Sequence, residues 1–317
     1  MQWEFVVDPE HIVGEAHAST IVDTSEGDLL CAWFGGAPER DPRVAIWLAR
    51  RSGDGWNDAA VVVDEPGVPT WNPVLYRDDD DRIQLFYKAG PSCDRWTGFI
   101  VTSDDDGETW SDPEIMPAGL LGPIKNKPIR MNNGLWLCGS SVETGGVRPW
   151  YCRMELFDAD AGAWPHVVDV VMPGTESGII QPAVWESEPG HVHALMRSTI
   201  GCVVRSDSTD SGKTWTTPRE TALPNNNSGL DVVRLDAGSL VLCCNPVQKG
   251  RTPLVLLRSG DNGASWTEHV VLEDAPGEYS YPAIISTSGG VAVTYTHRRK
   301  TISYRTVALD AFLPGMP

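Results

Sequence analysis

The sequence predicts an all-β fold, a six-bladed β-propeller with four antiparallel strands per blade, because two kinds of repeat run through it. The first repeat is a hairpin pattern of the form S-x-D-x-G-x-T-W. It is complete at 103–110 and 208–215, has serine in place of threonine at 259–266, and is degenerate at 52–56 and 158–164. The tryptophans of these five copies follow one another at intervals of 51 or 54 residues.

Each copy of this pattern has the composition of a tight turn. Asp and Ser side chains bond to nearby backbone amides, Gly supplies a positive φ, and the Trp can cover the turn. The pattern therefore predicts a hairpin between the third and fourth strands of a blade, with a structural role.

The second repeat is an apolar strand, a turn containing Gly or Asp, and another apolar strand. Its six copies begin at His17, Trp71, Asn126, Ile180, Gly229 and Ser280. Six units of about 50 residues use nearly the whole chain, so we expect a single domain over residues 1–317. The last unit (from Ser280) has no hairpin pattern after it, and an apolar stretch precedes the first unit (from His17). We therefore expect the N-terminal strand to complete the C-terminal blade, which removes an open sheet edge.

Composition excludes several classes of protein. Hydrophobic residues make up 41% of the chain, enough for a substantial core, and no apolar stretch of about 18 residues predicts a membrane-spanning helix. The net charge of −18 is spread along the chain, so we expect neither nucleic acid nor membrane as a partner. The N-terminus lacks the apolar core of a signal peptide, and seven cysteines without a CxxC pair favour a reducing, cytoplasmic location. We expect no disulfide, metal or cofactor, and Cys31, Cys138 and Cys243 read as small core residues.

Candidate site residues follow from the blade pattern. In a propeller the first strands line the axis, so residues that begin first strands and end second strands should line a funnel at one end of it. The residues that begin first strands are His17, Asn72, Lys127 with Lys125 and Asn126, Gln181, Asp231, and Tyr281 with Tyr279. The residues that end second strands are Trp33, Phe34, Lys88, Glu143, Arg197, Asn245, and His297 with Arg298.

Five cations in this set stand out in a chain of such negative charge: Lys88, Lys125, Lys127, Arg197 and Arg298. A ring of cations is suited to bind a carboxylate, which arginine can hold through two hydrogen bonds. The alternative is that they form structural ion pairs with residues such as Asp231 and Glu143.

The repeats and several motifs resemble the sialidase superfamily, and more specifically the bacterial and plant family of BNR/Asp-box repeat sialidase-like proteins. The motifs are HASTIV, AWFGG, WNPVL, GPIKNKPI, NNNSGLD and GEYSYPA, and the resemblance spans roughly residues 10–308. It implies a tyrosine nucleophile at Tyr279, beside Ser280, with Tyr281 as the neighbouring candidate. It also implies carboxylate-binding arginines at Arg197 and Arg298, and a general acid at Asp41.

Two positions depart from the sialidase pattern. His17 stands where sialidases have an arginine, and Gln181 stands at or near the glutamate that activates their tyrosine. A phenol, with a pKa of about 10, needs a neighbouring base or cation to react at neutral pH, and an amide cannot act as that base.

Three functions stay open, and each takes an anionic sugar or glycan as its partner. The first is an exo-acting hydrolase of terminal acidic sugars. The second is a β-eliminating lyase of the rhamnose–glucuronate type known among sialidase-like propellers, with His17, Tyr279, Tyr281 and Lys127 as candidates for proton transfer. The third is a non-catalytic propeller that binds a glycan.

Overall fold

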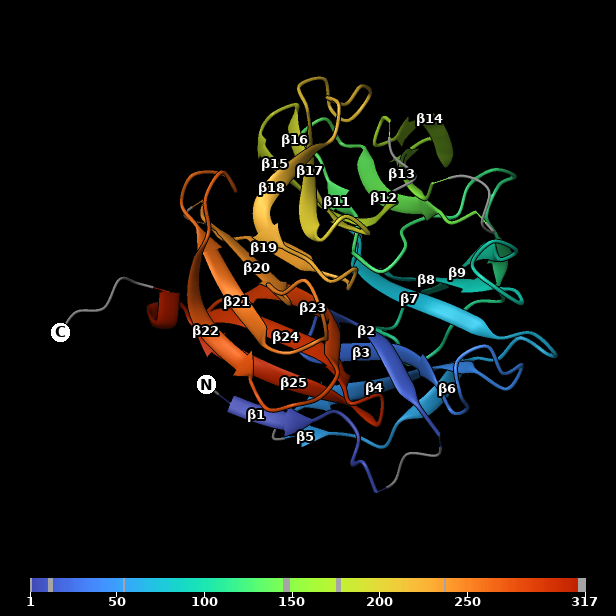
Figure 1. Ribbon diagram of the computed structural model, residues 1–317. Coiled ribbons are helices and arrows are strands. Elements are labelled where there is room, and N and C mark those ends of the chain that lie inside the picture. The colour runs from blue at the N-terminus through green and yellow to red at the C-terminus, as the bar shows by residue number, and fades with distance from the viewer. Residues whose placement is uncertain are drawn as a thin grey trace.

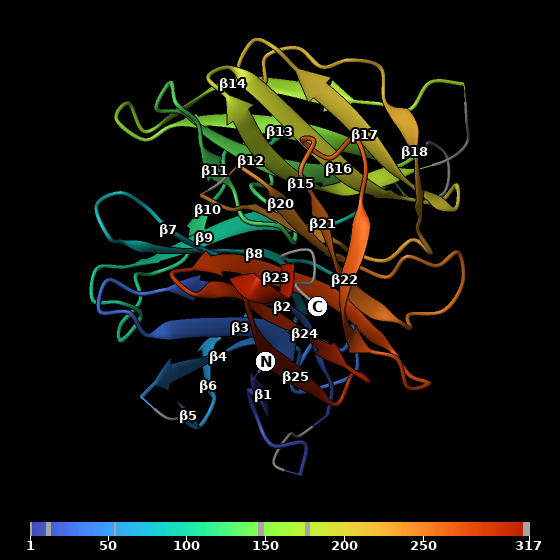
Figure 2. The ribbon, with the colours of Figure 1, turned by 90° about the vertical axis from the view of Figure 1, so that its left-hand side faces the viewer.

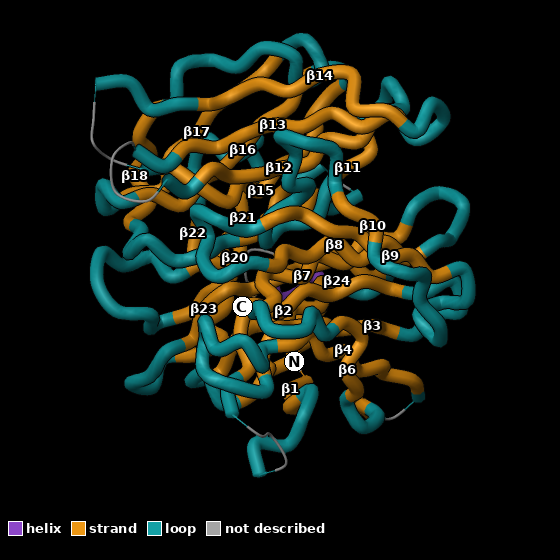
Figure 3. Tube along the Cα trace, turned by 90° about the vertical axis from the view of Figure 1, so that its right-hand side faces the viewer, coloured by secondary structure: helices purple, strands orange, loops and turns teal. Residues whose placement is uncertain are grey.

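The computed structural model describes residues 2–10, 14–53, 55–144, 149–174, 178–236 and 238–312. Six antiparallel sheets surround a central axis (Figure 1), which confirms the predicted six-bladed β-propeller. Loops and turns gather at two opposite faces, with the strands between them (Figure 3). The described helical segment is a short 3₁₀ turn, η1 (Leu309–Phe312), and no helix among the described residues could span a membrane.

Blades 1 to 6 are numbered in chain order. Blade 1 contains β2 (Ala16–Asp23), β3 (Leu29–Gly35), β4 (Ala45–Ser52), β5 (Gly55–Trp56) and β6 (Ala60–Val63), and blade 2 contains β7 (Thr70–Arg77), β8 (Ile83–Ala89), β9 (Thr97–Ser103) and β10 (Glu114–Ile115). Blade 3 contains β11 (Ile129–Arg130), β12 (Trp136–Val142), β13 (Tyr151–Asp158) and β14 (Ala163–Val170), and blade 4 contains β15 (Ile179–Glu188), β16 (His191–Ser198), β17 (Cys202–Ser208) and β18 (Arg219–Pro224). Blade 5 contains β19 (Asp231–Arg234), β20 (Leu240–Cys244), β21 (Leu254–Ser259) and β22 (Thr267–Glu273), and blade 6 contains β23 (Tyr279–Thr287), β24 (Gly290–His297), β25 (Thr301–Ala308) and β1 (Gln2–Phe5).

The N-terminal strand closes the ring, as the sequence predicted. β1 pairs antiparallel with β25, from Gln2 opposite Thr306 to Phe5 opposite Ser303. The two strands lie side by side in Figure 1 and Figure 2, blue beside red. The last blade is therefore built from both ends of the chain.

The core lies between the blades. The faces of neighbouring sheets pack together, and one cluster joins Leu30 and Ile46 of blade 1 to Leu75 and Leu85 of blade 2. Central strands have both faces covered, so they are nearly continuous apolar runs; every residue of β20 is buried. Cys31, Cys138 and Cys243 are free and fully buried, as expected of small core residues.

The S-x-D-x-G-x-T-W copies form the predicted third-to-fourth-strand turns. In the copy after β9, the Gly107 amide donates to Ser103 Oγ at 2.7 Å, and the Thr109 amide donates to Asp105 Oδ1 at 2.8 Å. The copies after β17 and β21 repeat both bonds within about 0.2 Å. The copy at 52–56 contains Asp54, which lies outside the described residues.

We predict that Gly107→Ala destabilises the protein more than a turn glycine normally would. Gly107 has φ +89°, and a Cβ there would lie 2.6 Å from Leu30 Cδ1 of the neighbouring blade. Gly27 has a similar φ of +87° but open space around it. Urea denaturation should show a loss of about 1 kcal/mol for Gly27→Ala, from backbone strain alone, and about 2–4 kcal/mol for Gly107→Ala. Equal losses would contradict the contact between blades.

Candidate functional site

Seven polar side chains from blades 1, 4, 5 and 6 meet at the end of the axis where the first strands begin. We call them the axial cluster: His17, Gln181, Arg197, Arg251, Glu278, Tyr281 and Arg299. Arg197 is the last residue but one of β16, Arg251 precedes β21, and Arg299 lies in the turn between β24 and β25. The S-x-D-x-G-x-T-W turns lie at the opposite end, as expected for a site that the structural turns do not obstruct.

A repeated bulge positions two members of the cluster. In blades 1, 2, 4 and 6 the first strand has two residues opposite one on the second strand. The first residue of each such pair has a positive φ: Ala18 53°, Asn72 41°, Gln181 55° and Tyr281 52°. Non-glycine residues rarely adopt this conformation, and bulges near sites redirect a side chain. The bulges turn Gln181 and Tyr281 toward Arg197, while Asn72 lies buried at the same position in blade 2.

Arg197 connects the cluster. Its Nη1 donates to the Tyr281 hydroxyl at 2.8 Å and to Gln181 Oε1 at 3.0 Å. Its Nε donates to Asn227 Oδ1 at 2.9 Å, and its Nη2 has no partner among the described residues. The residue is only 6% exposed. Arg197 is thus a rigidly held guanidinium with one nitrogen left for a ligand.

The other two arginines differ in how far protein groups occupy them. Arg251 lies over the Tyr281 ring, 5.6 Å from its centroid, and its Nη1 donates to Glu278 Oε1 at 2.6 Å and Ser280 Oγ at 3.1 Å. Within the described chain its Nε and Nη2 are unpaired. Arg299 donates to Glu278, to Glu39 Oε2 at 2.7 Å and to His17 Nε2 at 3.3 Å. Arg251 can therefore still bind an anion, whereas Arg299 is compensated by carboxylates.

His17 is a neutral, fully packed member of the cluster. Arginine can only donate, so Nε2 accepts from Arg299 and Nδ1 carries the proton, which it donates to Thr296 Oγ1 at 3.0 Å. The ring centroid lies 4.4 Å from that of Tyr281. Burial, and then the charges of Arg299, Arg251 and Arg197, lower the pKa of His17 well below its ordinary value. His17 thus orients Arg299 and Tyr281 without adding charge.

We predict that His17 makes the fold sensitive to mild acid. Below pH about 6.5, His17 binds a proton in the unfolded chain but not in the folded protein. The free energy of unfolding therefore decreases as the pH falls. Between about pH 6.5 and 5, His17→Gln should make the slope of unfolding free energy against pH shallower by up to about 1.4 kcal/mol per unit. His191→Gln, which removes an exposed imidazole, should leave the wild-type slope. Equal slopes for all three proteins would show that His17 does not cause the loss of stability at mildly acidic pH.

The three predicted lysines bind protein oxygens. Lys125 Nζ donates to Asn126 Oδ1, to the Leu230 carbonyl and, in a very short contact, to the Pro282 carbonyl. Lys127 pairs with Asp231 at 2.9 Å, the ion-pairing alternative considered from the sequence. Lys88 bonds to the Pro123 carbonyl. Burial lowers the pKa of both Lys88 and Lys125 to about 7.

We predict that Lys125→Met destabilises the ring by about 3 kcal/mol, because the substitution leaves three buried oxygens without their donor. Lys249→Met, at an exposed position, should change stability by less than about 0.5 kcal/mol. The measurement is urea denaturation of both variants at neutral pH. A loss for Lys125→Met no larger than for the control would contradict a structural role.

Three predicted residues lie apart from the cluster. Tyr279 lies in the core at 1% exposure, and its hydroxyl accepts from Arg298 Nε at 3.2 Å and Nη2 at 3.1 Å. Asp41 pairs with Arg43 at 2.8 Å, and these hydrogen bonds lower its pKa to about 2. The carboxylate of the β3–β4 loop that reaches the cluster is Glu39, through Arg299. Tyr281, Arg299 and Glu39 therefore occupy the places that the sequence suggested for Tyr279, Arg298 and Asp41.

Sequence reasoning missed Arg251, Arg299, Glu278 and Glu39. Arg251 precedes a third strand, a position outside the set of strand ends that was considered. Arg299 is adjacent to Arg298, and both have positive φ in the β24–β25 turn, so only the turn geometry decides which one faces the axis. The unusual run of two arginines and a lysine at 298–300 is the sequence feature that could have indicated Arg299 as a candidate.

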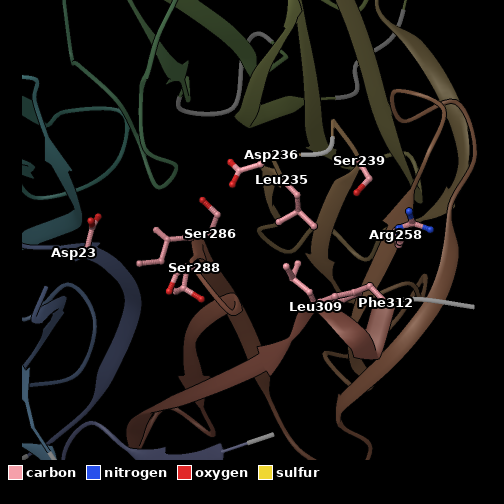
Figure 4. A pocket seen from close by; sticks show the side chains of 11 residues that line it. Asp23, Leu235, Asp236, Ser239, Arg258, Ser286, Ser288, Leu309 and Phe312 are labelled. Carbon is pink, nitrogen blue, oxygen red and sulfur yellow. The ribbon is translucent and has the colours of Figure 1, made fainter. Parts of the chain in front are cut away.

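A cavity of about 600 Å³ lies at the opposite end of the axis, where first strands finish (Figure 4). Its lining includes Asp23, Asp236, Arg258, Ser286 and Phe312 from blades 1, 5 and 6 and from η1. No axial-cluster residue lines it, so it is separate from the candidate site. Among the described residues, no three His, Cys, Asp or Glu side chains gather to hold a metal ion.

The model of the BNR repeat-like domain matches residues 27–294 of the chain. The chain belongs to this family. It is a sialidase-like BNR-repeat protein, as the sequence motifs indicated, and no curated protein sequence matches it.

Solved structures share its fold at low identity. The Hadza microbial sialidase Hz136 is 17% identical with a TM-score of 0.79, over 98% of this chain and 69% of that one. The intramolecular trans-sialidase of Ruminococcus gnavus is 12% identical with a TM-score of 0.77, over 99% and 98% of the two chains. A protein of unknown function from Dyadobacter fermentans DSM 18053 is 16% identical with a TM-score of 0.77, over 95% and 98%. Similarity at this level demonstrates the shared propeller fold.

Proposed function

We propose that this protein is an exo-acting glycosidase that removes a terminal, carboxylate-bearing sugar from a glycan. The observation that supports this most directly is the Tyr281 hydroxyl, bonded to Arg197 and flanked by Arg251 at the mouth of the axis. The names of two proteins that share the fold, a sialidase and an intramolecular trans-sialidase, agree with it.

Recognition of the carboxylate is assigned to Arg197 and Arg251. Each has unpaired guanidinium nitrogens within the described chain, and each approaches Tyr281 within 5.6 Å, measured from Cζ to the ring centroid. Guanidinium groups bind carboxylates with two parallel hydrogen bonds, which orients the sugar as well as holding it. Arg299 already pairs with three carboxylates, those of Glu15, Glu39 and Glu278, so its proposed role is to hold Glu278, and through it Arg251, in place.

The proposed nucleophile is the Tyr281 oxygen. Arg197 Nη1, at 2.8 Å, and the nearby Arg251 stabilise negative charge on that oxygen in a largely buried site. Gln181 shares the same Arg197 nitrogen and cannot accept a proton, so it orients the guanidinium. Activation therefore comes from two cations in this protein, in place of the carboxylate base that the sialidase pattern supplies.

We predict that Tyr281→Phe reduces kcat/KM for an aryl sialoside or aryl glucuronide by about 1000-fold or more, because it removes the nucleophilic oxygen. Tyr279→Phe is the matched control. It removes a hydroxyl that lies two residues away in the core and bonds to Arg298, so it should lower kcat/KM less than about 5-fold. Release of the aryl group is followed by absorbance.

Three results would count against the proposal. Equal loss in the two tyrosine variants would reject Tyr281 as the nucleophile. An unsaturated uronate product, detected by its ultraviolet absorbance, would indicate elimination and a lyase. Saturable binding of acidic sugars with no product formed would indicate a glycan-binding propeller.

A further inference from the structure

The three arginines of the axial cluster differ in the groups that hold them. Carboxylates pair with two of them: Glu278 accepts from Arg251 at 2.6 Å and from Arg299 at 3.1 Å, and Arg299 pairs with further carboxylates. The third, Arg197, has three protein partners, a phenol and two side-chain amides, and all three are neutral. Of the three, Arg197 is thus the arginine whose charge no ion pair within the described chain offsets.

The partners of Arg197 are close and well defined. Tyr281 and Gln181 accept from Nη1 at 2.8 Å and 3.0 Å, and Asn227 accepts from Nε at 2.9 Å. No Asp or Glu oxygen of the described residues lies within 4.0 Å of the guanidinium nitrogens, the distance of an ion pair. Burial raises the pKa of Glu143, and the charge of Arg197 opposes that shift, yet these two described residues form no ion pair. A ligand carboxylate would therefore supply a counter-charge that the protein does not.

Asn227 reaches Arg197 because the loop between β18 and β19 is fixed against β16. The fully buried Asn225 holds this loop, since its Oδ1 accepts from the Ser198 amide at 3.3 Å and from the Asn227 amide at 2.9 Å. Its Nδ2 donates to the Ser228 carbonyl at 3.1 Å. Ser198 follows Arg197 in β16, so these bonds bring the loop to the guanidinium.

The contact with Arg197 also fixes the orientation of the Asn227 carboxamide. Arginine can only donate, so the Asn227 atom that bonds to Nε is the oxygen, and its Nδ2 has no partner among the described residues. In a planar guanidinium Nε and Nη2 share one edge, so the unpaired Nη2 of Arg197 lies on the edge that Asn227 flanks. A carboxylate bound at Nη2 would thus approach a neutral amide.

We propose that Asn227 determines the preference of the site for anionic sugars, because it holds Arg197 in place without offsetting its charge. The inference rests on the proposed function, which assigns Arg197 to the carboxylate of the sugar. Asn227 is a positioning residue here, since it acts through Arg197. An acidic side chain of the same shape would form an ion pair with Arg197 and would repel a bound carboxylate.

The first test needs no substrate and uses Asn227→Asp. Asn227 has φ +60°, a conformation that Asn and Asp adopt more readily than most residues, and the two side chains have the same shape, so the variant should fold. Because Asn227→Asp supplies a counter-charge to a largely buried guanidinium, the thermal midpoint should rise by about 2–4 °C.

Asn226→Asp is the matched control for this stability test. It makes the same charge change one residue away, where Oδ1 accepts from the Ser228 hydroxyl at 2.6 Å, and should shift the midpoint by less than about 1 °C. A midpoint for Asn227→Asp no higher than that of Asn226→Asp would overturn the proposal.

The second test measures kcat and KM on an aryl sialoside and an aryl glucuronide. Asn227→Asp should raise KM for the glycoside that the wild type cleaves on the order of 100-fold, by repulsion of its carboxylate. Asn227→Gly, which suits the positive φ and removes the hydrogen bond without adding charge, should raise KM only about 5-fold. Asn226→Asp should raise it less than about 3-fold.

The outcomes separate the two proposals. If the wild type is active but Asn227→Asp and Asn227→Gly raise KM equally, the charge at this position has no effect on specificity. The role of Asn227 is then overturned and the proposed function stands. If the wild type cleaves no acidic glycoside, the proposed function itself fails, and the thermal midpoints alone still show whether the charge of Arg197 is uncompensated.

Discussion

The rest of the structure depends on one buried ammonium group, that of Lys125. Its Nζ bonds to Asn126 on blade 3 and to main-chain carbonyls of Leu230 on blade 5 and Pro282 on blade 6, so it links three inner strands across the axis. A desolvated ammonium requires acceptors on all sides, which fixes those strands relative to one another. Asn126 extends this restraint to blade 4 by donating to the Gln181 carbonyl at 3.0 Å. These hydrogen bonds therefore hold the bulged strand starts at Gln181 and Tyr281 rigidly in place.

In the axial cluster, arginine and carboxylate charges are paired, but Arg197 and Arg251 keep guanidinium nitrogens that no described residue bonds. Glu278 compensates Arg251 and Arg299, and Glu39 and Glu15 also pair with Arg299. What remains for a ligand is the open side of Arg197 and Arg251. In a chain of net charge −18 such a local excess of positive charge is short-ranged, so it acts only on groups that already lie next to the axial cluster. Under the proposed function, shape and neutral contacts must then contribute to the selection of a particular sugar.

Much of the architecture was predictable from the sequence because each sequence repeat corresponds to one blade. The tryptophan spacing and the strand–turn–strand units determine the number of blades, and the missing last hairpin pattern predicted the β1–β25 pairing. The site was predictable only by region. Tyr279 and Tyr281 share one side of an ideal strand, but the bulge at Tyr281 rotates the two side chains apart, and a bulge has no reliable sequence signal here. The choice between Arg298 and Arg299 depends likewise on two left-handed residues in a turn.

The pairing of β1 with β25 has a consequence for how the molecule is made. Some 300 residues separate Trp3 from its partner Ser303, whose side chains bond at 2.8 Å. During synthesis β1 emerges before the intervening strands of all six blades, and its partner β25 emerges only after them. Five blades can assemble from neighbouring hairpins as they leave the ribosome, while the sixth must wait. Until β25 has emerged, the newborn chain thus exposes an unsatisfied β-edge, on which chaperones or premature self-association would act.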